Sequence, residues 1–320
     1  MTLCLSLGPS SWRETSLDYL LFLTSILCFQ HSSYSASCHL QLQRNFTLNE
    51  SPPLVQMPVV ELNSPGCGGH ATFSETKSGS RASTQYLPWM VLLVTRTLSG
   101  VYRYCSGTII TERHVLTAGH CTFYTKEDPV SSIKVYYGMK GLKGPYKQAA
   151  RFLRHPRFDI SSLRNDIAIL MVDKCFALEK NTASVCLPVN HVDMERKQFS
   201  EVYWQVEENG AATIFADILS VYKASSCRLR LGDTTFESRA SFCGTGAATC
   251  RENQLDDSAG PVFTRGTNGR TLQVGILSYS ADCASRSATK VFTRLDVYVP
   301  WIQQNIAMHE KYEPLLLAVL

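Results

Sequence analysis

The sequence predicts an all-β protein built from antiparallel strands, and three observations support this prediction. From Pro88 onward, short runs rich in Val, Ile, Leu and Tyr alternate with stretches of Gly, Ser, Asn and Lys. Hydrophobic residues make up 44% of the 320-residue chain and charged residues 18%, which excludes a disordered chain. No apolar run reaches the roughly 18 residues that a membrane-spanning helix needs. A sandwich and closed barrels both fit this pattern.

The expected strands follow one another at short intervals. They cover residues 89–95, 104–110, 114–118, 133–138, 166–172, 212–221, 272–279 and 290–295. One late segment predicts a helix, because Pro300 suits a first helical turn and Trp301, Ile302 and Ile306 lie at helical spacing.

The amino-terminal region predicts export. Residues 19–29 form an apolar run, and small side chains follow at Ser33, Ser35, Ala36 and Ser37, as in a signal peptide and its cleavage region. We assign residues 1–35 to the signal peptide, with an uncleaved anchor as the alternative. Residues 36–80 read as an exposed leader or pro-segment, and Asn45 and Asn49 each begin an N-glycosylation sequon. The expected location is extracellular.

Cysteine content supports the same compartment. Twelve cysteines are many for a reducing environment, and no CxxC pair suggests a zinc ribbon. Loss of Cys4 and Cys28 with the signal peptide leaves an even number, as expected for a disulfide framework. The net charge of +4 comes without a polybasic run, so neither nucleic acid nor membrane is an expected partner.

Three segments carry the candidate chemistry: CSGTIITERHVLTAGHC at 105–121, NDIAILMVD at 165–173 and DDSAGPVF at 256–263. Together they resemble the chymotrypsin-like serine peptidase family, in the style of its secreted insect members. The resemblance runs from about Pro88 to Ile306 and matches the catalytic residues to His120, Asp166 and Ser258, in the family's chain order. In such a triad the histidine accepts the serine proton, and the buried carboxylate fixes the imidazole tautomer.

The resemblance implies two six-stranded antiparallel β-barrels and a C-terminal helix, in a peptidase domain at 81–308 followed by a tail at 309–320. It implies protein or peptide substrates, serpin-type inhibitors or other cascade proteases as partners, and no cofactor or metal. A zinc site at His114, His120 and Cys121 is disfavoured, because the family uses this cysteine in a disulfide. The implied disulfides are Cys105–Cys121, Cys227–Cys243, Cys250–Cys283 and Cys67–Cys186, which leaves Cys38 and Cys175 to pair with each other.

The nucleophile segment departs from the family pattern Gly-Asp-Ser-Gly-Gly-Pro. Here Asp256 replaces the first glycine and Ala259 the second. The oxyanion hole would consist of the backbone N–H groups of Asp256 and Ser258. The Asp256 side chain adds a negative charge near the developing oxyanion, where losing one donor costs roughly 10²–10³ in rate.

The expected substrate-binding residues also differ from the family. Its Ser-Trp-Gly lining reads Ser278, Tyr279 and Ser280, and a pocket-wall glycine is replaced by Lys290, whose long side chain could fill the pocket. The pocket floor is Ala248 or Glu252, depending on the register. Neither register supplies the aspartate of trypsin, so we do not predict cleavage after Lys or Arg.

The zymogen activation site is altered as well. The family's new amino terminus, which pairs with the aspartate at Asp257, aligns with Thr76, and Glu75 precedes it where a basic residue is usual. The family's Trp-Gly pair reads Trp204-Gln205. Two functional classes follow. The triad favours an active endopeptidase of unusual specificity, and the departures favour a catalytically silent homologue that binds a partner. A carbohydrate-binding or structural β-protein has little support.

Overall fold

The computed structural model describes residues 62–69, 71, 86–194, 199–207, 209–232, 236–246, 258–281 and 288–317, with side chains as far as 309. The predicted signal peptide, both sequons, Glu75, Thr76, Asp256, Asp257 and the Cys250–Cys283 pair lie outside these residues. Within them, no helix has the length and apolar character needed to cross a membrane.

The first barrel is formed by strands β1 (Met90–Thr97), β2 (Tyr102–Ile109), β3 (His114–Thr117), β4 (Val130–Tyr136), β5 (Tyr146–Arg154) and β6 (Ala168–Val172). They close in the order β1-β2-β3-β6-β5-β4, and every pair is antiparallel. The strands β1, β3 and β6 are almost wholly buried, which explains why their sequences are mostly apolar and do not alternate with period two.

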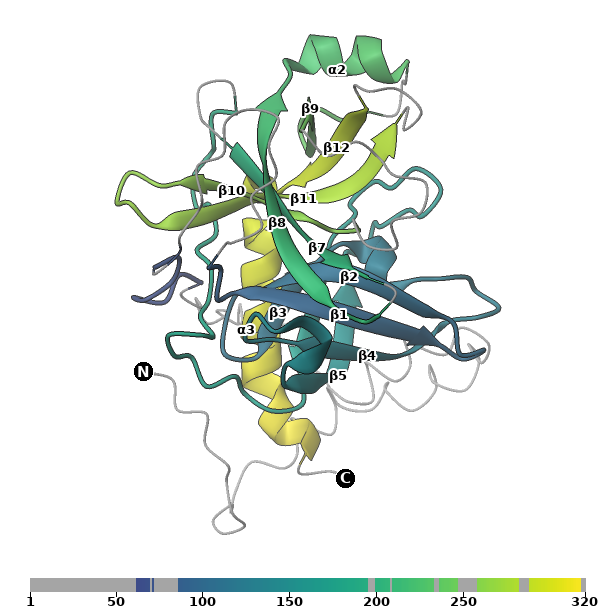
Figure 1. Cartoon of the computed structure of the whole chain (residues 1–320), viewed down its shortest axis with the longest axis vertical. Coiled ribbons are helices and arrows are strands. Elements are labelled where there is room, and N and C mark those ends of the chain that lie inside the picture. The colour runs from purple at the N-terminus through teal and green to yellow at the C-terminus, as the bar shows by residue number, and fades with distance from the viewer. Residues whose placement is uncertain are drawn as a thin grey trace, which may run out of the picture. The chain divides into compact units, whose positions relative to one another are not determined.

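The second barrel has the same closed form (Figure 1). Its strands are β7 (Phe199–Val206), β8 (Ala212–Val221), β9 (Ser241–Thr245), β10 (Pro261–Arg265), β11 (Thr271–Ala281) and β12 (Thr289–Arg294), closed in the order β10-β11-β12-β9-β8-β7. The prediction of two six-stranded antiparallel barrels is therefore confirmed.

Helices are few. The short α2 (Ala224–Leu231) leads into the second barrel at β9, and α3 (Val299–Leu317) follows the last strand (Figure 1). The predicted C-terminal helix is thus present, with Pro300 in its first turn. Ile302 and Ile306 belong to the same core cluster as the strands of the first barrel, so α3 packs against that barrel. The helix continues to Leu317, into the segment that the sequence suggested was a tail.

Part of the expected leader packs against the domain. Leu62 is 3% exposed and Cys67 is fully buried. The Asn63 amide donates to the Leu187 carbonyl at 2.9 Å and accepts from the Leu187 N–H at 2.8 Å, and a disulfide joins Cys67 to Cys186. We predicted an exposed leader here because the stretch is polar, but Asn63 is hydrogen-bonded to the domain and Cys67 is buried.

Hydrogen bonds connect the two barrels at the site of interest. The Thr108 hydroxyl on β2 donates to Gln273 Oε1 on β11 at 2.6 Å, and the Thr293 hydroxyl on β12 donates to the Asp166 carbonyl at 2.9 Å. The backbone N–H of Ser106 on β2 donates to the Ser258 carbonyl at 2.9 Å. The junction of the barrels is therefore a fixed surface on which residues from both can meet.

Candidate active site

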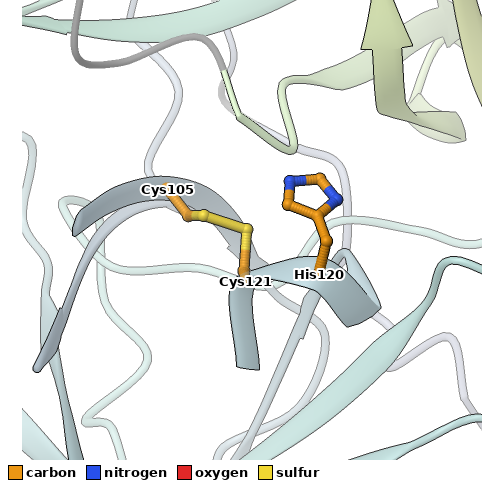
Figure 2. A group of neighbouring side chains, drawn as sticks. All are labelled: Cys105, His120 and Cys121. Atoms are coloured by element: carbon orange, nitrogen blue, oxygen red, sulfur yellow. A yellow bond between two sulfur atoms is a disulfide. The ribbon is translucent and has the colours of Figure 1, made fainter. Parts of the chain in front are cut away.

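His120 lies in a 3-10 turn, Gly119–Thr122, directly after β3. The neighbouring Cys121 forms a disulfide with Cys105 on β2, and Figure 2 shows the imidazole projecting beside this bridge. The disulfide fixes the turn to the strand before it. His120 is 9% exposed, so its position is set by packing on most sides.

Asp166 holds the histidine through two hydrogen bonds. The His120 backbone N–H donates to Asp166 Oδ1 at 2.8 Å, and Nδ1 lies 2.8 Å from Oδ2. A carboxylate oxygen only accepts, so Nδ1 carries the proton and Nε2 is left with a lone pair. A neutral imidazole in this tautomer is prepared to act as a general base.

The aspartate itself is fully buried and well supplied with donors. Besides His120, the Ser278 hydroxyl donates to Asp166 Oδ2 at 2.6 Å. A buried carboxylate is stable only when its oxygens are hydrogen-bonded. The Ser278 hydroxyl is engaged with Asp166, and its expected place in the lining of the substrate pocket stays a prediction.

Gly119 permits this close approach. A Cβ at this position would lie 2.9 Å from the Phe158 ring and 3.2 Å from Asp166 Oδ1. A side chain at this position would therefore require the Phe158 ring to move or the turn to shift away from the carboxylate.

Ser258 lies in the turn that leads into β10 and is half-buried. Its carbonyl accepts the Ser106 N–H, and Ser106 is adjacent to Cys105, whose disulfide partner Cys121 is adjacent to His120. A short covalent and hydrogen-bonded path therefore connects the serine to the histidine turn. The oxyanion residue Asp256 lies outside the described residues.

The turn around Ser258 is conformationally unusual. Ala259 has φ +64° and is 1% exposed, so a residue with a Cβ occupies the left-handed region that glycine prefers. The next residue, Gly260, needs to be glycine, because a Cβ there would lie 2.9 Å from the Val202 carbonyl oxygen.

The remaining expected pocket residues lie on two paired strands. Tyr279 and Ser280 are half-buried on β11, and Ser280 pairs with Lys290 on β12. Lys290 is 2% exposed, and its Nζ lies 2.9 and 2.8 Å from the two carboxylate oxygens of Glu201. Sequence reasoning missed Glu201. The available signal was a carboxylate between Phe199 and Tyr203, on the face of the strand that alternation assigns to the interior.

Three disulfides in the structure match the expected pairs: Cys67–Cys186, Cys105–Cys121 and Cys227–Cys243. Cys175 is also disulfide-bonded, and its proposed partner Cys38 lies outside the described residues.

The ligand atoms of Cys105, His120 and Cys121 lie within 4.8 Å of one another, which is a metal-like spacing. The two sulfurs are bonded to each other (Figure 2) and present no thiolate. The His120 Nδ1 is taken by Asp166. The cluster is therefore better explained as a disulfide beside a hydrogen-bonded histidine than as a metal centre.

Comparison with known proteins identifies the class. The family model described as Trypsin matches residues 76–302. The chain therefore belongs to the trypsin family, the chymotrypsin-like serine peptidases.

Relatives include the proclotting enzyme of Tachypleus tridentatus, which is 26% identical over 89% of this chain and 79% of the enzyme. Serine protease 1 of Homo sapiens is 26% identical over 66% of this chain and 83% of its own length. The urokinase-type plasminogen activator of Gallus gallus is 24% identical over 82% of this chain, which spans 64% of the activator. A solved structure titled "Structure of GrC" superposes with a TM-score of 0.57 at 22% identity, over 68% of this chain and 94% of that one, and supports the fold.

Proposed function

We propose that this protein is a secreted serine endopeptidase that uses His120, Asp166 and Ser258. The observation that carries the proposal is the paired hydrogen bonding of His120 to the buried Asp166. This pairing orients Nε2 and stabilises the positive imidazolium that forms when the base is protonated.

The reaction follows from these roles. Nε2 of His120 takes the Ser258 hydroxyl proton as the serine oxygen attacks the substrate carbonyl carbon. The imidazolium then gives this proton to the leaving amine, and an acyl-serine remains. A water, deprotonated by the same nitrogen, releases the acid and restores the serine. The N–H groups of Ser258 and Asp256 are the proposed oxyanion donors.

Further parts of the proposal rest on the sequence. Residues 1–35 are a signal peptide, the 36–80 leader is glycosylated at Asn45 or Asn49, and the product is an extracellular zymogen. Its substrates are proteins or peptides, and its partners are serpin-type inhibitors or other proteases of a cascade. The binding surface is formed by Ser278, Tyr279, Ser280 and Lys290, and cleavage after Lys or Arg is not expected.

A silent homologue is the second candidate. Ala259 in a left-handed turn beside the nucleophile favours it, as do the altered residues Asp256 and Thr76. Such a protein would bind a protease or inhibitor without hydrolysis, and its binding would survive loss of the serine.

Labelling with a fluorophosphonate separates these candidates. The wild type should be labelled, before or after limited proteolysis, and Ser258→Ala should lose both labelling and turnover, the latter by about 10³-fold or more. Ser131→Ala, which removes an exposed serine on β4, is the matched control and should be labelled like the wild type. A correctly folded wild type that is never labelled, and whose partner binding persists in Ser258→Ala, would establish the silent homologue.

A further inference from the structure

The interior of the second barrel contains a layer of charged side chains. Phe199 on β7, Leu219 on β8 and Phe292 on β12 belong to one apolar core cluster. Residues two apart on a strand share a face, so Glu201, Asp217 and Lys290 point into the same interior. All three are at most 2% exposed. Burying a charged side chain raises the free energy of the folded protein even when the charge is paired, so the presence of this layer calls for an explanation.

Each acid in this layer has its own donor. Glu201 and Asp217 face each other directly across β7 and β8, where like charges repel. The Lys290 ammonium contacts both oxygens of Glu201, at 2.9 and 2.8 Å, and the Tyr203 hydroxyl donates to Asp217 Oδ2 at 3.2 Å. Lys290 Nζ also lies 5.9 Å from the centroid of the Tyr203 ring. The ammonium is therefore surrounded by a carboxylate and an aromatic face.

The layer lies one strand away from the triad. Ser278 on β11 donates to Asp166, and Ser280, two residues further along the same strand, pairs with Lys290 on β12. On the other side Lys290 pairs with Gly244 on β9, where a side chain would collide with the Ser220 carbonyl oxygen at 2.6 Å. The buried Lys290 side chain therefore lies in the second barrel at the strand position next to Ser280 of β11.

We propose that Lys290 fills, from within the chain, the space in which a substrate side chain would be held, with Glu201 as its built-in counter-ion. The protein then carries an internal lysine in place of the substrate's side chain. The preferred substrates should then have a small residue, Gly, Ala or Ser, before the cleaved bond. This expectation rests on the proposed peptidase function. Glu201 should in addition be able to bind an external cation once the Lys290 side chain is removed.

Binding of the fluorescent cation p-aminobenzamidine tests the inference without reading turnover. The wild type should show no saturable binding. Lys290→Ala should bind the amidinium about tenfold or more tightly, because charge-assisted hydrogen bonds to Glu201 become available. Lys290→Ala/Glu201→Gln should lose the gain, and Lys134→Ala, which removes an exposed lysine on β4, should show none. Circular dichroism checks that each variant is folded.

Lys290→Ala leaves Glu201 buried without its lysine, and a second measurement applies if it does not fold alone. Refolding it in propylammonium or butylammonium should restore the native spectrum, and tetramethylammonium, which has no N–H donor, should not. Saturable binding of the amidine by the wild type would overturn the inference. So would a folded Lys290→Ala without gained binding, a gain that persists with Glu201→Gln, or an unfolded Lys290→Ala that no primary ammonium rescues. Amidine binding does not depend on the reactivity of Ser258. The fluorophosphonate experiment therefore tests the peptidase function separately from this inference.

Discussion

The two barrels share a topology but differ in what fills them. Among the described residues, the buried polar side chains on the strands of the first barrel are hydroxyls, such as Thr95, Ser106 and Thr108, and one histidine, His114. The second barrel also buries hydroxyls, such as Thr264 and Thr293, but it buries Glu201, Asp217 and Lys290 as well. Hydroxyls can satisfy themselves on nearby carbonyls, whereas charges need partners from other strands. Within the part of the chain that the structure describes, the first barrel therefore supports His120 with no Asp, Glu, Lys or Arg buried on its strands, whereas the second barrel contains an ion pair beside its apolar core.

Disrupting the Lys290–Glu201 ion pair should give the largest difference in stability between the two barrels. Glu201→Gln leaves the Lys290 ammonium buried without a full counter-charge and should lower the free energy of unfolding by about 3–5 kcal/mol. Thr95→Val, which removes a hydroxyl that donates to the Cys121 carbonyl at 3.1 Å, should cost only about 1 kcal/mol. Urea unfolding with intact disulfides gives both values.

The apolar double variant is the control for charge against packing. Lys290→Met/Glu201→Leu keeps comparable volume without either charge, so it should be much closer to the wild type than Glu201→Gln. If Glu201→Gln lowers the free energy of unfolding no more than Thr95→Val does, the two barrels do not differ in this way.

The disulfides offer a matched comparison, since Cys105–Cys121 and Cys227–Cys243 each join residues with a sequence separation of 16. On chain-entropy grounds, each pair should contribute about 3 kcal/mol. Replacing either pair with alanines should therefore lower stability by similar amounts. Only the first pair fixes the turn that carries His120, so only its loss should slow fluorophosphonate labelling of the folded protein. Equal slowing by both replacements would show that the bridge has no local role.

His114 makes the first barrel sensitive to pH. Burial, with the nearby charges of His309 and Arg113, lowers the pKa of His114 from 6.5 to about 3. The unfolded chain binds this proton near pH 6.5 and the folded chain does not, so the stability contribution falls as the pH drops from 6.5 toward 3. The slope approaches about 1.4 kcal/mol per pH unit in that window.

Comparison with His114→Gln isolates this effect. At pH 7 the variant should be the less stable protein, because it loses the contact of the His114 ring with the Thr111 hydroxyl at 2.7 Å. By pH 5 the gap should narrow by about 2 kcal/mol, since only the wild type pays for protonation of the unfolded histidine. The gap between Thr95→Val and the wild type should stay constant. A constant gap for His114→Gln would contradict the lowered pKa.

Much of the architecture was predictable because strands such as β1, β3 and β6 are buried on both faces and rich in apolar residues. The strand β5 was missed, since YKQAARFLR is exposed or half-buried along its whole length and does not alternate. The helix α2 was missed for a related reason: only Cys227 is buried in ASSCRLRL, so no apolar stripe marks it.

The candidate site divides in the same way. His120, Asp166 and Ser258 stand in contiguous motifs that resemble a family, so they could be named from the sequence. Glu201 could not, because its meaning depends on Lys290, a residue 89 positions away that reaches it only through barrel closure. The hydrogen bond from Ser278 to Asp166 could not be predicted either, since the sequence does not reveal which way its hydroxyl points.

The smallest expected effect lies in the turn beside the nucleophile and compares strained residues from the two barrels. Replacing Ala259, at φ +64°, with glycine should relieve about 1–2 kcal/mol of backbone strain, and loss of the buried methyl should cost about 0.8 kcal/mol. Ala259→Gly should therefore stabilise the folded protein slightly. Asn165, at φ 52°, also occupies the left-handed region, but its side chain donates to the Arg157 carbonyl at 2.7 Å and accepts from the Tyr298 hydroxyl at 3.0 Å. Asn tolerates this conformation better than Ala, so Asn165→Gly gains little and should be destabilising by about 1 kcal/mol. Thermal unfolding of both variants gives these signs.

If Ala259 holds the turn at Ser258 away from its reactive geometry, Ala259→Gly should also label faster with the fluorophosphonate. An unchanged labelling rate would mean that the alanine does not limit the reactivity of Ser258.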